Sequence, residues 1–231
     1  MASLTGAGER VAVVVGAGEL GRAIAVLLAG AGFTVVAVDR TQKALDELPE
    51  GIRREVGDAT DQAVAKTLID RVAAEVGPPE VLVNTIGGFL LGEAISVTPE
   101  NVRAMMDVNL GPALWLSQAV EPYMRERGSG AIVHVSARPG TDPTAGMAAY
   151  SLSKAALSHL VRILDLELRP HGIRVNAVAP QLIDTSRNRE LFPAEVLAHA
   201  VAPETVADVI GFLVSDLAAP VSGAIVPAYG A

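Results

Sequence analysis

The sequence predicts an α/β fold: a doubly wound parallel sheet of about seven strands with helices covering both faces. Short β-branched runs alternate with longer segments of helical periodicity, which is the order that strand–helix–strand units produce. The first two runs, RVAVVV (10–15) and TVVAVD (34–39), are almost continuously apolar, as expected of strands buried on both faces. Half of the 231 residues are hydrophobic and 19% are charged, so the chain can bury a sizeable core.

Each predicted strand is a short apolar or alternating run, and the seven lie at residues 10–15, 34–39, 51–56, 80–85, 131–136, 173–178 and 224–228. The predicted helices lie between them, at residues 19–30, 41–48, 61–76, 99–127, 150–169 and 204–215. Because no linker or repeat interrupts this order, residues 1–231 are expected to form a single domain. The irregular segment 181–203 is expected to lie over the carboxyl ends of the strands as a short substrate lid.

The composition argues against several classes of function. The net charge of −8, without a basic run, is unlike a nucleic-acid surface. The absence of cysteine excludes disulfides and thiolate sites, and the four scattered histidines (His134, His159, His171 and His199) predict no metal centre. No apolar run approaches the ~18 residues that a bilayer requires. We therefore expect a cytoplasmic protein with no membrane or nucleic-acid partner.

A glycine-rich segment, VVVGAGELGRA, places Gly16, Gly18 and Gly21 between a predicted strand and a predicted helix. In this setting the first glycine permits a tight turn, the second lets backbone N–H groups approach a pyrophosphate, and the third lets the helix pack closely on the strand. The helix N-terminus also favours phosphate charge. Turn formation alone is the alternative, but the strand–helix context predicts a dinucleotide-binding loop that includes Glu19 and Leu20.

An acidic residue, Asp39, ends the second predicted strand, 18 residues after Gly21. This is close to the spacing of ~20 residues expected for the acid that binds the adenosine ribose. A carboxylate accepts hydrogen bonds from two ribose hydroxyls and repels a 2′-phosphate, so NAD is the favoured cofactor. Arg40 could partly neutralise such a phosphate, so NADP remains open.

Tyr150 and Lys154 are four residues apart at the start of a predicted helix, so their side chains share one helix face. A phenol, with a pKa near ~10, is a poor acid–base group at neutral pH unless a neighbouring cation favours its anion. Lys154 is such a cation. The pair indicates acid–base chemistry; on spacing alone, a solvated surface pair is the alternative.

Together with the glycine loop, the Tyr150–Lys154 pair resembles the short-chain dehydrogenase/reductase family, and the similarity runs almost from end to end. Similar segments are GDATD (57–61), NTIGG (84–88), DVNLGP (107–112), YSLSK (150–154), GIRVNAVAP (172–180) and the tail 215–230. The resemblance implies a Rossmann-type fold. The further residues it implies in cofactor binding are Asp58 and Ala59 at the adenine, Asn84 and Gly87 under the cofactor, Pro180, Ile183 and Thr185 near the nicotinamide, and Tyr150 and Lys154 themselves.

The same resemblance implies a reaction. Tyr150 would donate a proton to the oxygen or nitrogen that is reduced while the nicotinamide delivers hydride. Lys154 would hold the ribose and lower the pKa of the tyrosine, and Asn109 would support a water-mediated proton path. General acid catalysis of this kind contributes about 10²–10⁴-fold.

Two features depart from the family pattern. The glycine loop is the compact form, and the position of the family's catalytic serine, counted back from Tyr150, is Ala137. Ser136 is one residue early, and successive strand residues face opposite sides. Dihydropteridine reductases, a branch of the family, share both departures and have segments similar to GGF, GMAAY and IDTSRNRELFP (183–193). This narrower resemblance implies a small conjugated cyclic C=N or C=O acceptor such as quinonoid dihydropterin.

Two other functions stay open. One is a general short-chain carbonyl reductase or alcohol dehydrogenase that tolerates the missing serine. The other is a dinucleotide-binding scaffold that has lost catalysis, against which Asn109, Tyr150 and Lys154 are all retained. Fold arguments alone do not separate these functions, because this type of fold carries many chemistries.

Two predicted helices carry more apolar surface than one sheet contact needs. The apolar residues are Met105, Met106, Leu114, Trp115, Leu116 and Tyr123 in the first, and Leu157, Leu160, Val161, Ile163, Leu164 and Leu168 in the second. Deep burial of both helices is one explanation. Because large exposed apolar patches are rare on monomers, we favour a homodimer or homotetramer formed through helices near 100–127 and 150–169. The other expected partner is a small-molecule substrate.

Overall fold

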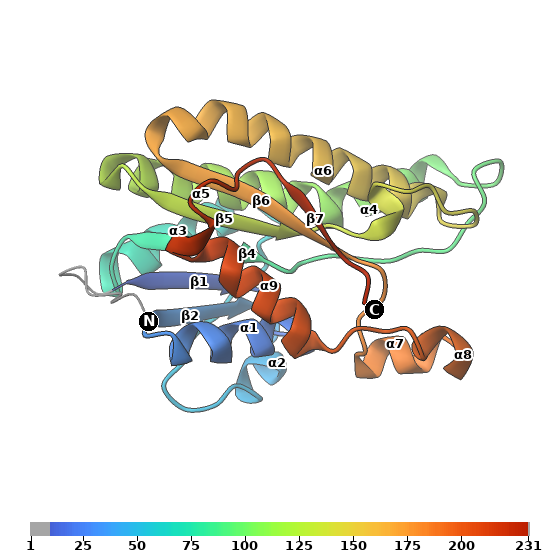
Figure 1. The fold of residues 1–231 in the computed structure, drawn as a ribbon, viewed down its shortest axis with the longest axis horizontal. Helices are drawn as coiled ribbons and strands as arrows, with labels where there is room; N and C mark the ends of the chain where they lie inside the picture. Colours follow the sequence, from blue (N-terminus) through green and yellow to red (C-terminus); the bar gives the residue numbers. More distant parts are fainter. Residues whose placement is uncertain (1–9, 231) are drawn as a thin grey trace.

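The computed structural model describes residues 10–230, and its centre is a seven-stranded parallel sheet (Figure 1). The strands are β1 (Val11–Val15), β2 (Thr34–Asp39), β3 (Arg53–Val56), β4 (Pro79–Asn84), β5 (Gly130–Val135), β6 (Ile173–Pro180) and β7 (Ile225–Ala228). Their order is β3-β2-β1-β4-β5-β6-β7, so all carboxyl ends meet at one edge and the direction of winding reverses between β1 and β4. This confirms the predicted fold class; residues 1–9 and 231 of the predicted domain lie outside the described residues.

Helices cover both faces of the sheet. On one face lie α1 (Glu19–Gly30) and α9 (Pro203–Val214), with the short α2 (Gln42–Asp46) near the edge; on the other lie α3 (Gln62–Glu75), α4 (Pro99–Asn109), α5 (Gly111–Arg127) and α6 (Ala148–Leu168) (Figure 1). Two further short helices, α7 (Ser186–Leu191) and α8 (Ala194–Leu197), lie between β6 and α9. These two belong to the segment predicted as a lid.

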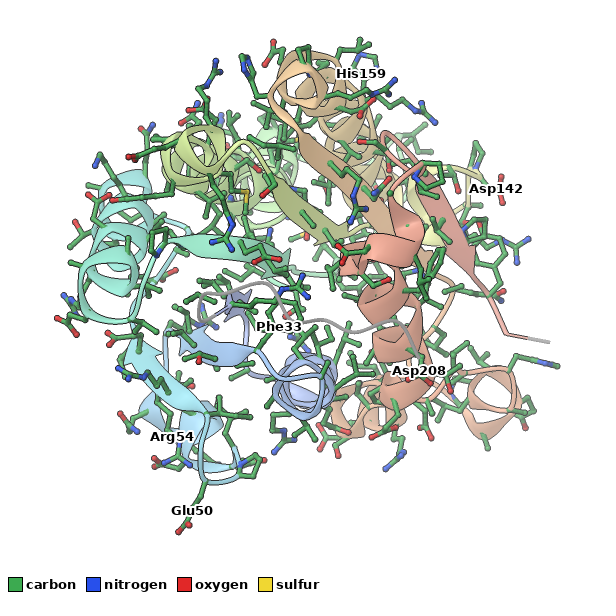
Figure 2. The ribbon with its side chains drawn as sticks, turned by 60° about the vertical axis from the view of Figure 1, so that its left-hand side comes forward. Phe33, Glu50, Arg54, Asp142, His159 and Asp208 are labelled. Carbon is green, nitrogen blue, oxygen red and sulfur yellow. The ribbon has the colours of Figure 1, made fainter. Side chains whose placement is uncertain are left out.

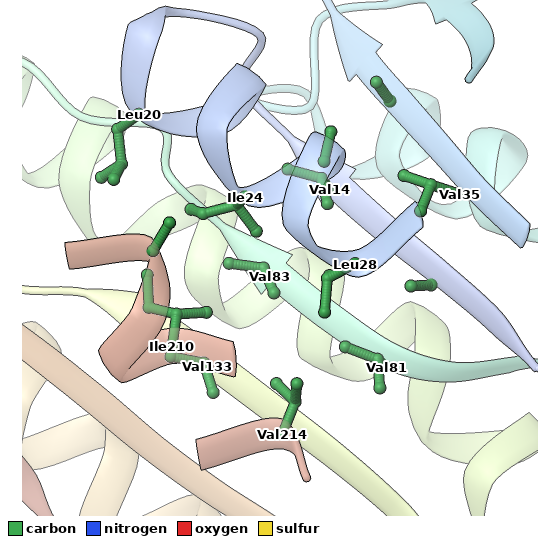
Figure 3. Packing of buried hydrophobic residues seen from close by; sticks show 14 of the residues in the cluster. Val14, Leu20, Ile24, Leu28, Val35, Val81, Val83, Val133, Ile210 and Val214 are labelled. Carbon is green, nitrogen blue, oxygen red and sulfur yellow. The ribbon is translucent and has the colours of Figure 1, made fainter. Parts of the chain in front are cut away.

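Alternating strand residues supply two separate cores. Val14 faces α1 and α9, while its neighbour Val13 faces α3 and α5. Figure 3 shows the first core, where Ile24 and Leu28 of α1 lie near Ile210 of α9 above the sheet. Each fully buried aliphatic side chain contributes about 1.5–3 kcal/mol. The carboxyl edge of the sheet is therefore held by well-packed layers on both sides.

The predicted continuous helix over residues 99–127 was wrong, because the structure divides it at Leu110. The first part, α4, begins with a capping box between Thr98 and Asn101 and ends at Asn109. The second part, α5, has Pro112 in its first turn. Proline has no N–H group to donate to a preceding carbonyl, so the helical hydrogen-bond ladder is interrupted here. The break places Asn109 at the end of a helix, beside the carboxyl edge of the sheet.

Glu50, Arg54, Asp142 and His159 are polar side chains on the exposed surface (Figure 2). Exposed large apolar side chains also occur on several elements. Those on α6 are Leu152, Ile163 and Leu166, with 58%, 40% and 72% of their surface exposed. Within residues 10–230, every helix is too short or too polar to cross a bilayer.

Candidate active site

A cleft of about 490 Å³ opens at the carboxyl ends of β1, β2 and β4, and we call it the nucleotide cleft. Most of the residues predicted to bind the cofactor line it: Gly16, Gly18, Glu19, Leu20, Gly21, Asp39, Arg40, Asp58, Ala59, Gly87, Ile183 and Thr185. The cleft lies where the direction of winding reverses, the usual ligand position in open parallel sheets.

The glycine loop has the geometry of a phosphate cradle. Gly16 has a φ of +97°, a conformation that favours glycine. A Cβ at Gly21 would lie 1.7 Å from the carbonyl oxygen of Gly16, so only glycine fits there, whereas a Cβ at Gly18 would meet nothing within 4 Å. Gly18 also caps α1 without any side-chain hydrogen bond, which leaves the first N–H groups of the helix for a ligand. The loop therefore fits a dinucleotide pyrophosphate.

Two carboxylates, Asp39 and Asp58, are held in the cleft after β2 and β3. Asp39 accepts hydrogen bonds from the backbone N–H of Ala17 and of Thr41, both at 2.9 Å. Asp58 accepts from the hydroxyl and the N–H of Thr60, at 2.7 and 3.0 Å. These bonds from Thr60 hold the pKa of Asp58 below its usual value. Both acids are oriented before any ligand binds, which suits them for hydroxyl or amine donors.

A second hollow of about 210 Å³ adjoins the nucleotide cleft, and we call it the substrate pocket. Five residues line both spaces: Gly87, Val135, Ile183, Arg187 and Asn188. Tyr150 and Lys154, on the first turns of α6, line the substrate pocket together with Pro180. The structure thus places the predicted acid–base pair in the pocket that adjoins the nucleotide cleft.

Tyr150 is held by aromatic packing. The ring of Phe89, from the loop after β4, meets the Tyr150 ring edge-on, with centroids 5.0 Å apart. Phe89 also packs against Phe192, which follows α7, at 5.8 Å. The lid segment is therefore joined to the tyrosine through one intervening ring.

Burial sets the protonation of the pair. It raises the pKa of Tyr150 to about 12 and lowers the pKa of Lys154 to about 8. The Lys154 Nζ donates to the carbonyl oxygen of Val135 at 2.8 Å. The expected lowering of the tyrosine's pKa by Lys154 was therefore wrong for this structure, because desolvation of the phenol is the dominant effect.

Ser136 and Ala137 both line the substrate pocket, but only Ser136 carries a hydroxyl. The Ser136 hydroxyl lies 2.8 Å from that of Ser158 and donates to the carbonyl oxygen of Lys154 at 3.3 Å, so it is engaged with α6. Ala137 contributes only a methyl group to the substrate pocket. Ser136 thus has its hydrogen bonds elsewhere and does not stand in for a serine at position 137.

The two predicted asparagines, Asn84 and Asn109, are fully buried and line neither space. The Asn109 side chain accepts from the N–H of Gly88 at 2.9 Å and donates to the hydroxyl of Ser153 at 2.9 Å. It thereby ties the loop after β4 to the first turns of α6. The Asn84 side chain accepts from the N–H of Ile86 at 3.0 Å and holds the start of the same loop.

Several lining residues were missed by sequence reasoning. The Thr85 hydroxyl donates to the carbonyl oxygens of Val15 and Gly16, at 3.1 and 3.0 Å, and so joins the end of β4 to the glycine loop. Its position within the NTIGG segment could have indicated that it lies near the cofactor. Phe89 directly follows that segment, but nothing in the local pattern predicted the contact with Tyr150. Arg187 and Asn188, from the lid, also had no periodic signal.

The lid segment is tied to the glycine loop. The Glu19 carboxylate accepts a hydrogen bond from the backbone N–H of Ser186 at 2.7 Å, at the start of α7. At the base of the lid, Ile183 pairs with Val201. In the described part of the chain, no group of three or more His, Asp or Glu side chains could hold a metal ion.

Comparisons with known proteins agree with this geometry. The family model for short chain dehydrogenase matches residues 10–196. Galactitol 2-dehydrogenase of Rhizobium johnstonii is 36% identical, covering 95% of this chain and 93% of the relative; L-xylulose reductase of Mesocricetus auratus is also 36% identical, covering 97% and 96%. A solved 7 alpha-hydroxysteroid dehydrogenase complexed with NADH and 7-oxo glycochenodeoxycholic acid has a TM-score of 0.89 at 29% identity, covering 96% and 93%. The chain belongs to the short-chain dehydrogenase family and is an NAD(P)-dependent oxidoreductase.

Proposed function

We propose that the protein transfers hydride between NAD(H) and the carbonyl or alcohol carbon of a small polar substrate, with Tyr150 as the proton donor in reduction. The observation that carries this proposal is the position of Tyr150 and Lys154 in a substrate pocket that shares a wall with the nucleotide cleft. Such an arrangement lets the bound nicotinamide reach the carbon of a carbonyl group while the proton donor reaches its oxygen.

The pocket residues have distinct parts in this reaction. The bound cofactor supplies or accepts the hydride. Tyr150, with a pKa raised to about 12, stays protonated at neutral pH and can donate to the oxygen of a reduced carbonyl. Lys154 is charged below its pKa of about 8, and we expect its ammonium to bind the ribose. For Asn109 the contacts with Gly88 and Ser153 support a positioning role, and the water-mediated path stays a prediction.

The preference for NAD rests on Asp39. Its carboxylate lines the nucleotide cleft and is oriented by two backbone donors. A 2′-phosphate at the ribose would place negative charge beside it. Arg40 lines the same cleft, so activity with NADP(H) is expected to be weaker rather than absent.

The substrate class favours polyols and ketoses over dihydropterins. The relatives reported above are named for galactitol and L-xylulose, and neither is a dihydropteridine reductase. One observation still favours a conjugated cyclic acceptor. Position 137 of the pocket is an alanine, so it has no hydroxyl to hold a carbonyl oxygen. We retain that acceptor as the second candidate.

A substrate panel separates the two candidates. Purified protein is tested with NADH on ketoses, cyclic ketones and quinonoid dihydropterin, and with NAD⁺ on polyols. The proposal expects turnover of ketones and polyols, and expects Ala137→Ser to raise ketone reduction. Turnover of quinonoid dihydropterin alone, with no gain from Ala137→Ser, would instead support the second candidate. Tight NADH binding with no turnover on any compound would support a silent scaffold.

We also propose that the exposed apolar face of α6 is covered by a second copy of the chain. Ile163 and Leu166, 40% and 72% exposed, lie on this face. Light scattering tests the proposal: a dimer or tetramer is expected at micromolar concentration. A monomer there would contradict it.

A further inference from the structure

Arg187 occupies a position that the proposed reaction does not yet use. It belongs to α7, in the lid segment, and lines both the nucleotide cleft and the substrate pocket. Two other arginines have partners: Arg189, on the same helix, pairs with Asp184 at 2.7 Å, and Arg138 donates to Gln181 of the pocket lining at 2.8 Å. Within residues 10–230, Arg187 has no hydrogen bond or ion pair to another side chain.

The charge of the substrate pocket is one-sided. Its charged lining residues are Lys154 and Arg187, and none of the residues that line it is an aspartate or glutamate. In contrast, Glu19, Asp39 and Asp58 line the nucleotide cleft. In a chain of net charge −8, a pocket lined by two cations and no acid favours an anionic ligand over a cationic one.

The chemistry of the two cations differs. The Lys154 ammonium is buried and already donates to Val135. Arg187 is exposed at the rim, where its guanidinium keeps a planar fork of donors for an incoming carboxylate or phosphate. The pyrophosphate of the cofactor has other donors, the N–H groups at the start of α1.

We propose that Arg187 binds an anionic group of the substrate, a carboxylate or a phosphate, and so determines specificity. The inference rests on the proposed function and deepens it: the substrate is a small ketone or alcohol that carries a negative charge. Asn188 and Gln181 also line the pocket, where their amide groups are bonded to Ile183 and Arg138. The cofactor pyrophosphate is the other source of an anion, and the experiment separates it.

The test compares a charged and a neutral ketone of similar shape, 3-oxocyclohexanecarboxylate and its methyl ester, with NADH as reductant. We expect the wild-type protein to prefer the carboxylate. Arg187→Gln should raise the KM for the carboxylate about ten- to hundred-fold, the size of a lost charged hydrogen bond, and leave the ester almost unchanged. Arg187→Lys should restore part of the preference. Arg189→Gln, on the same short helix, is the matched control and should behave like the wild type.

NADH titration by fluorescence distinguishes the alternative. If Arg187→Gln weakens NADH binding and lowers turnover of both ketones equally, the arginine serves the cofactor and the proposal is overturned. It is also overturned if the wild type shows no preference for the carboxylate. Should neither ketone be reduced, the proposed function fails for these ketones, but binding of benzoate against benzamide to the NADH-loaded protein still tests Arg187. Equal binding of both compounds would refute the anion site.

Discussion

The nucleotide cleft and the substrate pocket adjoin each other but are built in different ways. The cleft is formed largely by backbone: a glycine with positive φ, a second glycine that admits no Cβ, and the free N–H groups of α1. The pocket is formed by side chains from the loop after β4, the end of β5, the start of α6 and the lid. Backbone geometry suits a ligand common to a family, and side chains suit a substrate that varies within it.

The largest expected effect lies in the pocket. Tyr150→Phe should lower the turnover number by about 10²–10⁴-fold, because the proton donor is removed while the ring still packs on Phe89. NADH affinity, measured by fluorescence titration, should change little. Tyr123→Phe is the control, since Tyr123 lies on α5 and bonds Asp70 at 2.9 Å. Full activity of Tyr150→Phe would show that the proton donor is another group.

The backbone character of the cleft can be tested by comparing Gly21→Ala with Gly18→Ala. The first would place a Cβ 1.7 Å from the carbonyl oxygen of Gly16, so we expect both thermal stability and NADH affinity to fall, by about 1–3 kcal/mol of strain. The second meets no protein atom within 4 Å, so the melting temperature should hold while NADH binding weakens. Equal melting temperatures for the two variants would contradict the close packing of α1 on the loop.

Asp39 is the side chain of the cleft that we expect to select NADH over NADPH. Asp39→Asn keeps the shape and an acceptor for the N–H of Ala17 but removes the negative charge. The ratio of kcat/KM for NADPH over NADH should rise about tenfold, as expected when repulsion of about 1–2 kcal/mol is relieved. An unchanged ratio would mean that Arg40 or another group sets the preference.

The smallest predicted effect is a pH dependence in the pocket. Lys154 has a pKa lowered to about 8, so its cation is present below that pH and is lost above it. The kcat/KM for NADH should fall to about half at a pH of about 8 and decline further above it. Tyr150, with a pKa of about 12, contributes nothing in this range. Lys154→Arg should lower the overall rate but remove this decline, because arginine remains charged. A flat profile for the wild type would contradict the assignment to Lys154.

Much of the fold and of the cleft could be predicted because the determining signals are local. All seven predicted strands overlap those observed. For the buried strands, such as β1 and β2, runs of Val between glycine or polar breaks carry the signal. The glycine loop and Asp39 lie within one strand–helix–strand unit, so their spacing along the chain already determines their arrangement. The division of the segment 99–127 into two helices also has a local signal, Gly111 and Pro112, although the prediction of one helix overlooked it.

The sequence by itself determined the strand order along the chain, the glycine loop, the acid at the end of β2 and the spacing of Tyr150 and Lys154. Only the tertiary structure decided that Ser136 is engaged by α6, that burial dominates the pKa of Tyr150, and that Arg187 lines the pocket without a partner acid among the described residues. The reason is physical. Backbone conformation responds to neighbours a few residues away, whereas the direction, burial and charge environment of a side chain depend on segments that meet only after folding.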